Sequence, residues 1–232
     1  NNVAVGYQSL YSNTTGIQNV AVGQALTRAT EAQDNIALGL LAGRGTTTGS
    51  YNIAIGTLAL GSGSATTSEG NVGVGYYALS ENSGNNNVAI GRQALHVNTT
   101  ASNNTAVGYQ AGYSNTTGNE NTTVGQLAGY GITTEVQNTA IGRNSLSSIT
   151  TTDSNTAVGQ GAGREITTGA KNTVIGRFTG NAGGIDIRTS DNNIVLSDGD
   201  GNVRARFTSG GDAFFTNGLA VSASVSGIDF SG

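Results

Sequence analysis

The sequence has no cysteine, proline, methionine or tryptophan among its 232 residues, and it has a single histidine. Without cysteine, disulfides, thiolate chemistry and cysteine-based zinc or iron–sulfur sites are excluded. No apolar run is long enough to span a membrane, and no signal peptide opens the chain. The formal charge of −4 gives no basic surplus for nucleic acid. We therefore expect no cofactor, metal or membrane insertion, and the missing methionine indicates a segment of a longer polypeptide.

Glycine is abundant instead, with 37 residues, while hydrophobic residues make up 36% of the chain and charged residues only 10%. A chain this rich in glycine, asparagine and threonine is often disordered, because too little apolar surface offsets the entropy of ordering. Two features argue against disorder here. The charge content is low, and the apolar residues recur at fixed positions. The composition therefore predicts an ordered chain of a fibrous kind.

A five-residue phrase, Asn-x-Ala-(Val/Ile)-Gly, recurs from residue 2 to residue 176, with occasional swaps. Its asparagines are Asn2, Asn19, Asn35, Asn52, Asn71, Asn87, Asn104, Asn121, Asn138, Asn155 and Asn172. Its glycines are Gly6, Gly23, Gly39, Gly56, Gly75, Gly91, Gly108, Gly125, Gly142, Gly159 and Gly176. Successive glycines lie 16, 17 or 19 residues apart, and the longest interval contains the low-complexity stretch 61–67. A fixed period of this size is typical of solenoids.

Other positions follow the same period. A small residue comes three positions after nearly every motif glycine, and the next residue is leucine or glycine. A threonine pair follows in many units, as at Thr99-Thr100 and Thr116-Thr117. Small side chains after a turn are what a narrow interior requires.

Each phrase has the alternation of a short strand, as in Val88 and Ile90 on either side of Ala89. Such a strand buries little unless it pairs with copies above and below it. We expect the asparagine side chains to form a ladder, the glycines to turn the chain with positive φ, and the threonine pairs to form a second strand. The sequence thus predicts an all-β solenoid of about eleven coils, each of about 17 residues, on the order of 50 Å long. Because both strand faces are suited to burial, we also expect side-by-side association, for which a fibre would use three-fold symmetry.

Segment 86–91 resembles the head repeats of trimeric autotransporter adhesins, and segment 104–112 resembles repeats in tail fibres of phages that infect marine cyanobacteria. The resemblance covers about three quarters of the chain and implies a left-handed parallel β-roll in an intertwined homotrimer. The period here is longer than in the adhesins, and threonine follows the motif asparagine from Thr105 onward. The resemblance is specific for architecture and only weakly specific for the host.

The period breaks after the last motif glycine, which predicts a roll over 1–180 and a β-hairpin-rich neck or shaft over 181–232. A hairpin is expected where 193–196 and 203–207 flank a turn rich in Asp and Gly. Residues 219–225 alternate in a further predicted strand. All five phenylalanines lie beyond Arg177, where we expect them to form an aromatic core for the neck.

Tyrosines that lie just after a motif glycine, or at the following turn, are the candidate receptor- or carbohydrate-binding residues. Amphipathic rings at turns can stack on sugars or pack against a partner, and equally they can cover a subunit seam. The candidates are Tyr7, Tyr11, Tyr76, Tyr77, Tyr109, Tyr113 and Tyr130.

Catalytic and metal sites have less support. Asp198, Asp200 and Asn202 have the spacing of a calcium loop, but Val203 stands where glycine is needed, so turn chemistry explains the cluster better. The glutamates of the repeats are scattered over turns, and no pair of glycosidase carboxylates follows from the sequence.

The expected function is the structural and host-receptor-binding part of a phage tail fibre or related virion appendage, without enzymatic activity. Its expected partners are two further copies, other virion proteins, and a cell-surface polysaccharide or protein receptor. The alternatives are the head of a bacterial trimeric adhesin, on the bacterial surface, and a tailspike-type polysaccharide hydrolase.

Overall fold

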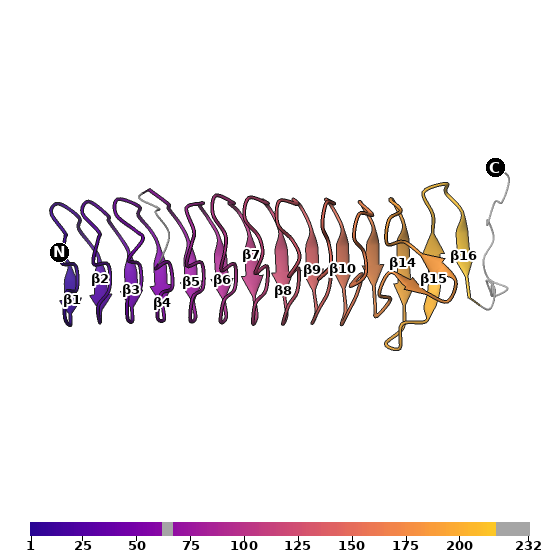
Figure 1. The fold of residues 1–232 in the computed structure, drawn as a ribbon, viewed down its shortest axis with the longest axis horizontal. Helices are drawn as coiled ribbons and strands as arrows, with labels where there is room; N and C mark the ends of the chain where they lie inside the picture. The colour runs from indigo at the N-terminus through magenta and orange to yellow at the C-terminus, as the bar shows by residue number, and fades with distance from the viewer. Residues whose placement is uncertain (62–66, 217–232) are drawn as a thin grey trace, which may run out of the picture.

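The chain forms a rod of stacked coils in a computed structural model that describes residues 1–61 and 67–216 (Figure 1). Every regular element within these ranges is a β-strand, and they contain no helix long and apolar enough to cross a membrane. The all-β solenoid with coils about 17 residues apart is therefore confirmed.

One three-residue strand belongs to each of the first eleven coils, and five further strands follow. The first eleven are β1 (Val3–Val5), β2 (Val20–Val22), β3 (Ile36–Leu38), β4 (Ile53–Ile55), β5 (Val72–Val74), β6 (Val88–Ile90), β7 (Thr105–Val107), β8 (Thr122–Val124), β9 (Thr139–Ile141), β10 (Thr156–Val158) and β11 (Thr173–Ile175). The others are β12 (Asn181–Ala182), β13 (Ile185–Asp186), β14 (Ile194–Ser197), β15 (Val203–Phe207) and β16 (Ala213–Phe215).

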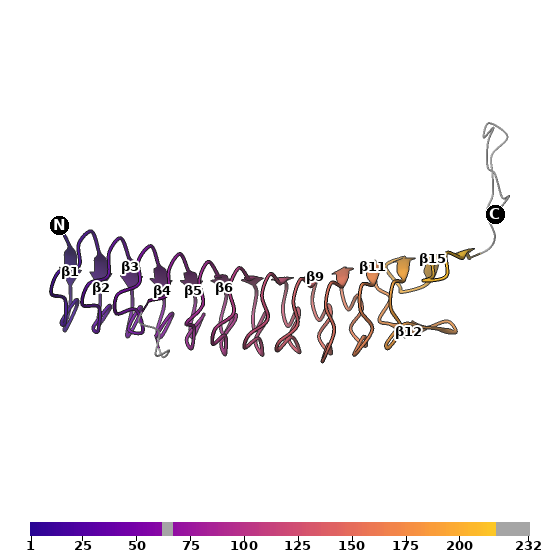
Figure 2. The same cartoon turned by 90° about the horizontal axis from the view of Figure 1, so that it is seen from above.

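The strands of the repeats form one parallel sheet in which each strand pairs in register with the next coil. Ala21, for example, lies beside Ala37, which lies beside Ala54. Figure 2 shows this sheet along one side of the rod, with the connecting turns on the other side. Since the side-chain period of a strand is two, the middle residue points into the coil and its two neighbours point outward.

Alanine fills most of the interior. The middle strand residue and the small residue after the turn are both fully buried in most coils, as Ala106 and Ala111 show. The next position is leucine in some coils, including three successive ones at Leu60, Leu79 and Leu95, and glycine in others. A Cβ on Gly112 would lie 3.0 Å from the Leu95 side chain, so a leucine in one coil occupies the space that a glycine leaves in the next.

The predicted asparagine ladder is present from Asn2 to Asn193. In each step, the Oδ1 of one motif asparagine accepts the backbone N–H of the next, at 2.8–3.1 Å. The side-chain amide then donates to a turn carbonyl, as from Asn104 Nδ2 to Gly118 O at 2.9 Å. Buried polar groups need hydrogen-bond partners, and the asparagine side chain provides them for backbone N–H and C=O groups inside the narrow coil.

The motif glycines have positive φ, as predicted, between 95° and 136°. The predicted second strand is wrong. Backbone amides of the Thr-Thr-Gly segments converge on a single carbonyl of the next coil, as Thr14, Thr15 and Gly16 do on Thr30 O at 2.9, 3.2 and 3.3 Å. In a β-strand, successive backbone N–H groups point alternately to the two neighbouring strands. Three successive N–H groups that donate to one carbonyl therefore form a turn, and this turn links neighbouring coils by hydrogen bonds.

The sheet continues past residue 180, because β14 pairs in parallel with β11. Between these strands the chain forms the β12–β13 hairpin, closed by Gly183 and Gly184 at φ +60° and +79°. The predicted hairpin over 193–207 is confirmed as antiparallel β14–β15, and β16 extends it. The predicted strand 219–225 lies outside the described residues.

The expected aromatic core of the neck is not formed by the described phenylalanines. Phe178 is fully buried, but in the core of the last coils, beside Ile166 and Val195. Phe207 and Phe215 are exposed on the outer face of β15 and β16, whereas Phe214 is exposed on the opposite face, where it pairs with Arg206. Phe230 lies outside the described residues.

Candidate functional site

Five of the seven candidate tyrosines gather on adjacent coils at the trailing edge, the turn residues one to five positions after each motif glycine. Ring contacts connect four of them, together with His96, in a continuous series. Tyr76 and Tyr77 have centroids 4.5 Å apart, Tyr77 meets His96 at 5.3 Å, and His96 meets Tyr113 at 5.3 Å. Tyr113 and Tyr130 are stacked with centroids 5.4 Å apart and an interplanar angle of 9°. This aromatic cluster spans four successive coils.

Stacking of the coils explains the cluster. His96, Tyr113 and Tyr130 all lie five residues after their motif glycine, so in-register coils place them directly above one another. The centroid distances are close to the ~4.8 Å spacing of paired strands. The sequence carries this signal as a shared offset from the glycine, although tyrosine identity alone does not reveal it. His96, which the sequence analysis did not propose as a site residue, belongs to the series for this reason.

Arg92 extends the cluster along a second row, the residues that directly follow each motif glycine. Its guanidinium carbon lies 5.7 Å from the Tyr76 ring centroid and 5.8 Å from that of Tyr109, which belong to the coils on either side. Cation–π contacts of this kind hold the guanidinium between two rings. Within the described part of the chain Arg92 has no ion pair with a carboxylate. Its N–H groups therefore remain available to an external acceptor.

The polar groups of the cluster include strong donors. Partial burial, and after it the neighbouring Tyr76 hydroxyl, raises the pKa of Tyr77. His96 Nδ1 lies 2.7 Å from the buried Ser80 hydroxyl, which fixes the ring orientation.

Tyr7 and Tyr11 lie apart from this cluster, in the first coil, and are highly exposed at 76% and 73%. The next coil places Gln24 beside that edge, where its side-chain amide donates to Gln8 at 2.8 Å. Tyr51, which was not a candidate, is exposed on the opposite edge, directly before Asn52. These tyrosines have no ring partner among the described residues.

A second feature is the outer face of the sheet. The third residue of each repeat strand points outward and is aliphatic in every coil: Val5, Val22, Leu38, Ile55, Val74, Ile90, Val107, Val124, Ile141, Val158, Ile175 and Leu196. The parallel column two residues earlier is valine, isoleucine or threonine. Val5 is 56% exposed and Ile175 47%. The outer face of β1 to β11 thus carries no charge and no cover in a single chain.

The aliphatic face continues into the last strands. Directly paired residues of antiparallel strands share a face, and Ile194 pairs with Phe207 while Ala205 pairs with Phe215. The Phe207 and Phe215 rings meet edge to face at 6.1 Å. The uncovered apolar surface therefore runs along the whole described rod and ends in aromatic side chains.

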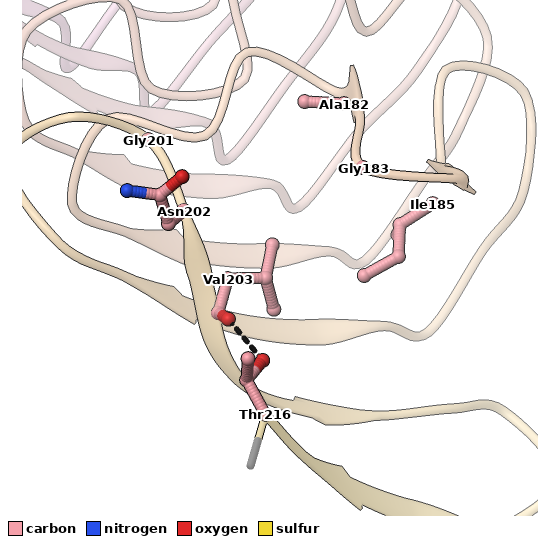
Figure 3. A pocket seen from close by; sticks show the side chains of 7 residues that line it. All are labelled: Ala182, Gly183, Ile185, Gly201, Asn202, Val203 and Thr216. Atoms are coloured by element: carbon pink, nitrogen blue, oxygen red, sulfur yellow. Dashed lines mark hydrogen bonds between the residues drawn. The ribbon is translucent and has the colours of Figure 1, made fainter.

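A pocket lies beside the β12–β13 hairpin (Figure 3). Its lining within the described residues is Ala182, Gly183, Ile185, Gly201, Asn202, Val203 and Thr216, with the Thr216 hydroxyl donating to Val203 O. This lining has no charged side chain among the described residues.

The Asp198 cluster acts as a turn. Asp198 Oδ1 accepts the backbone N–H groups of Asp200 and Asn202 at 3.0 and 2.9 Å, and its Oδ2 accepts from Arg204. Hydrogen bonds from the Asn202 side chain, followed by those from Arg204 and the two amides, lower the pKa of Asp198 well below its usual range. The carboxylate oxygens that a calcium ion would need are thus already engaged with the hairpin turn.

Comparison with protein-family models, with curated proteins and with solved structures finds no match to this chain.

Proposed function

We propose that this chain is the structural and receptor-binding segment of an extracellular fibre built from three copies, as in a phage tail fibre. Stacked coils give length from a short repeat, and the trailing edge presents side chains at a fixed axial spacing. The observation that carries the proposal is the uncovered aliphatic face of the sheet. A contiguous apolar surface of this extent marks an interface between proteins.

Further copies of the same chain are the simplest cover for this face. The apolar column is as long as the rod, and a parallel neighbour of identical length and spacing matches it along its whole extent. Exposed β-surfaces without charge otherwise promote aggregation. The proposals of three copies and of a phage origin rest on the resemblance of the repeats. In an assembly with closed cyclic symmetry, the aliphatic face of every copy is covered by a neighbour.

The head of a bacterial trimeric adhesin is the second candidate, and the same face supports it. The two differ in what adjoins the rod. A membrane anchor with a coiled-coil stalk belongs to an adhesin on the bacterial surface, whereas a virion-attachment domain belongs to a tail fibre. The full-length gene with its neighbours decides between them.

Binding without cleavage is part of the proposal, with a cell-surface polysaccharide or protein as the receptor. Incubation with host polysaccharide, followed by an assay for new reducing ends, tests it. A sustained release of reducing ends would replace the proposal with the hydrolase alternative.

Assembly is tested by the mass in solution. We expect light scattering to give three times 23.2 kDa for the wild type. Val124→Glu combined with Ile141→Glu places two charges on adjacent strands of the aliphatic face and is expected to give monomers. The matched control is Gln126→Glu with Gln160→Glu, which adds the same charges at exposed positions of the trailing edge and should leave the mass unchanged. A wild-type chain that stays folded and monomeric would overturn the proposal.

A further inference from the structure

Charge is divided between the two edges of the sheet. The two rows of the trailing edge, one and five positions after the motif glycine, contain no Asp or Glu, and their arginines are Arg28, Arg44, Arg92, Arg143, Arg164 and Arg177. The leading edge, the turn directly before each motif asparagine, carries Asp34, Glu69, Glu120, Asp153 and Asp191, with Lys171 as its cation. A three-residue strand separates the two edges by roughly 10 Å.

Two glutamates lie one position beyond the second row, Glu81 and Glu165. Glu81 adjoins the cluster, because its backbone N–H donates to His96 O at 3.3 Å, but it forms no ion pair with Arg92 among the described residues. Glu165 forms an ion pair with Arg164 at 3.1 Å, several coils from Arg92. On the leading edge, Asp153 and Asp191 accept the backbone N–H groups of Val136 and Ala170 at 2.7 Å, so they serve the fold. The guanidinium of Arg92 is the cation of the aromatic cluster, and it is exposed.

The groups presented by the cluster fit a polyhydroxylated anion. The guanidinium of Arg92 offers a planar fork that matches a carboxylate in a bidentate geometry, and its two tyrosine neighbours hold that fork in place. Tyrosine hydroxyls repeat along the rod at the coil spacing, as in Tyr113 and Tyr130. A neutral apolar ligand would leave these donors without acceptors, which is costly on binding.

The spacing of the cations decides which polyanion fits. In the row that follows the motif glycines, Arg92 and Arg143 are three coils apart and Arg143 and Arg177 two coils apart, or roughly 14 and 10 Å. A nucleic acid strand carries one charge per ~3.4 Å and would leave most phosphates unpaired. An acidic polysaccharide has at most one carboxylate per sugar, so its charges are more widely spaced and a larger share of them can meet an arginine.

We propose that the trailing edge binds an acidic polysaccharide that lies along the rod, with a sugar carboxylate on Arg92 and sugar hydroxyls on the Tyr76, Tyr109, Tyr113 and Tyr130 phenols. This inference deepens the proposed function and rests on it, because it names the receptor chemistry and the edge that binds it. It also leaves the aliphatic face free for assembly.

Binding is tested by titrating the purified wild-type protein with hyaluronan, alginate and polysialic acid as carboxylate-bearing polymers, and with dextran as a neutral one. We expect saturable binding to at least one acidic polymer, weakening with added salt, and none to dextran. Arg92→Gln should weaken the binding by about tenfold or more, since a charge-assisted bidentate contact is lost. Tyr109→Phe, which keeps the ring and removes the hydroxyl, should give a smaller loss.

The chain offers a matched control for Arg92→Gln. Lys171→Gln removes the same charge from the leading edge, and glutamine already stands at the equivalent positions Gln18 and Gln137. Likewise, glutamine stands at Gln24, Gln126 and Gln160 in the Arg92 row, so both variants should fold. Lys171→Gln is expected to bind like the wild type.

Three outcomes would overturn the inference: no binding to any acidic polymer, equal binding to dextran, or equal losses in the Arg92 and Lys171 variants. Stronger binding of a single-stranded oligonucleotide would assign the edge to nucleic acid instead. The mass measurement separates the two proposals, because a trimer that binds no acidic polymer leaves the fibre proposal standing.

Discussion

Motif glycines lie where the backbones of successive coils approach closely, and two constraints act on them at once. Their φ values are positive, which favours glycine. In addition, a Cβ on Gly108 would lie 2.6 Å from the carbonyl oxygen of Gly125 in the next coil. Backbone cannot move aside as a flexible side chain does. The glycine is therefore required by stacking as well as by the turn.

Gly108→Ala is predicted to destabilise the fold by roughly 2–5 kcal/mol, because overpacking against backbone adds to the strain of positive φ. Gly161→Ala is the matched control, since Gly161 has φ +68° but nothing within 4 Å of the added Cβ. It should cost only about 1–2 kcal/mol. Thermal and denaturant unfolding measure both. Equal losses would show that φ alone, and no close approach, selects glycine at Gly108.

Residue patterns predicted much of the interior and less of the site. The fixed offset of the asparagines predicted their ladder, because in-register coils bring equal offsets together. The same reasoning, applied to His96, Tyr113 and Tyr130, would have predicted their stacking. The position of Arg92 between Tyr76 and Tyr109 depends on side-chain rotamers and on tyrosines that occupy the same row in both adjacent coils, so the repeat alone does not reveal it.

At the scale of elements, the coil has one strand and a threonine turn. The threonine pairs have the β-branched character of strand residues, which is why the sequence favoured a second strand. The structure instead uses their amides to bind one carbonyl of the next coil. A short β-hairpin, β12–β13, was not predicted either, although Gly183-Gly184 is a typical two-residue hairpin turn. The surrounding loss of period obscured that signal.

Asp186 and Arg188 form an ion pair at the end of the β12–β13 hairpin. The Arg188 Nε and Nη2 groups donate to Asp186 Oδ1 and Oδ2 at 3.0 and 2.8 Å, and this pairing lowers the pKa of Asp186 from 3.8 to about 2. A lowered pKa means that the contact stabilises the hairpin above pH 3.8 and is lost as pH falls toward 2. Both side chains are exposed, so the effect stays local.

Arg188→Gln is predicted to return the pKa of Asp186 toward 3.8, because its largest cause is the side-chain hydrogen bonding from Arg188. A carboxyl NMR titration of the wild type and the variant measures this. Arg143→Gln, on a distant coil, serves as the control and should leave the Asp186 titration unchanged. A wild-type midpoint at 3.8 would show that the ion pair is not formed in solution.

At the scale of the whole molecule, each coil contacts only its neighbours, as in other solenoids. The sheet, the asparagine ladder and the alanine interior all repeat with the same step. Stability is then close to a sum of coil and interface terms. Removing one complete repeat should leave the others in their native register.

Deletion of 139–155, which joins Asn138 to Thr156, is predicted to give a folded rod shorter by ~4.8 Å. Deletion of 139–147 removes about half a coil, breaks the asparagine register, and should lose the β-sheet signal. Circular dichroism and small-angle scattering compare the two. Similar behaviour of both deletions would contradict a stack held in register by the ladder.

The asparagine ladder tolerates coils of different length. Successive ladder asparagines are 16, 17, 19 or 21 residues apart, yet each Oδ1 still accepts the next backbone amide, and the longest interval, from Asn172 to Asn193, contains a complete extra hairpin. In that interval the extra residues form the β12–β13 hairpin, and β14 still pairs with β11 in the same parallel register. The coil turns are therefore natural grafting points, where a foreign peptide can be displayed at a chosen height along the fibre, and where a lineage can exchange surface loops while its scaffold stays the same.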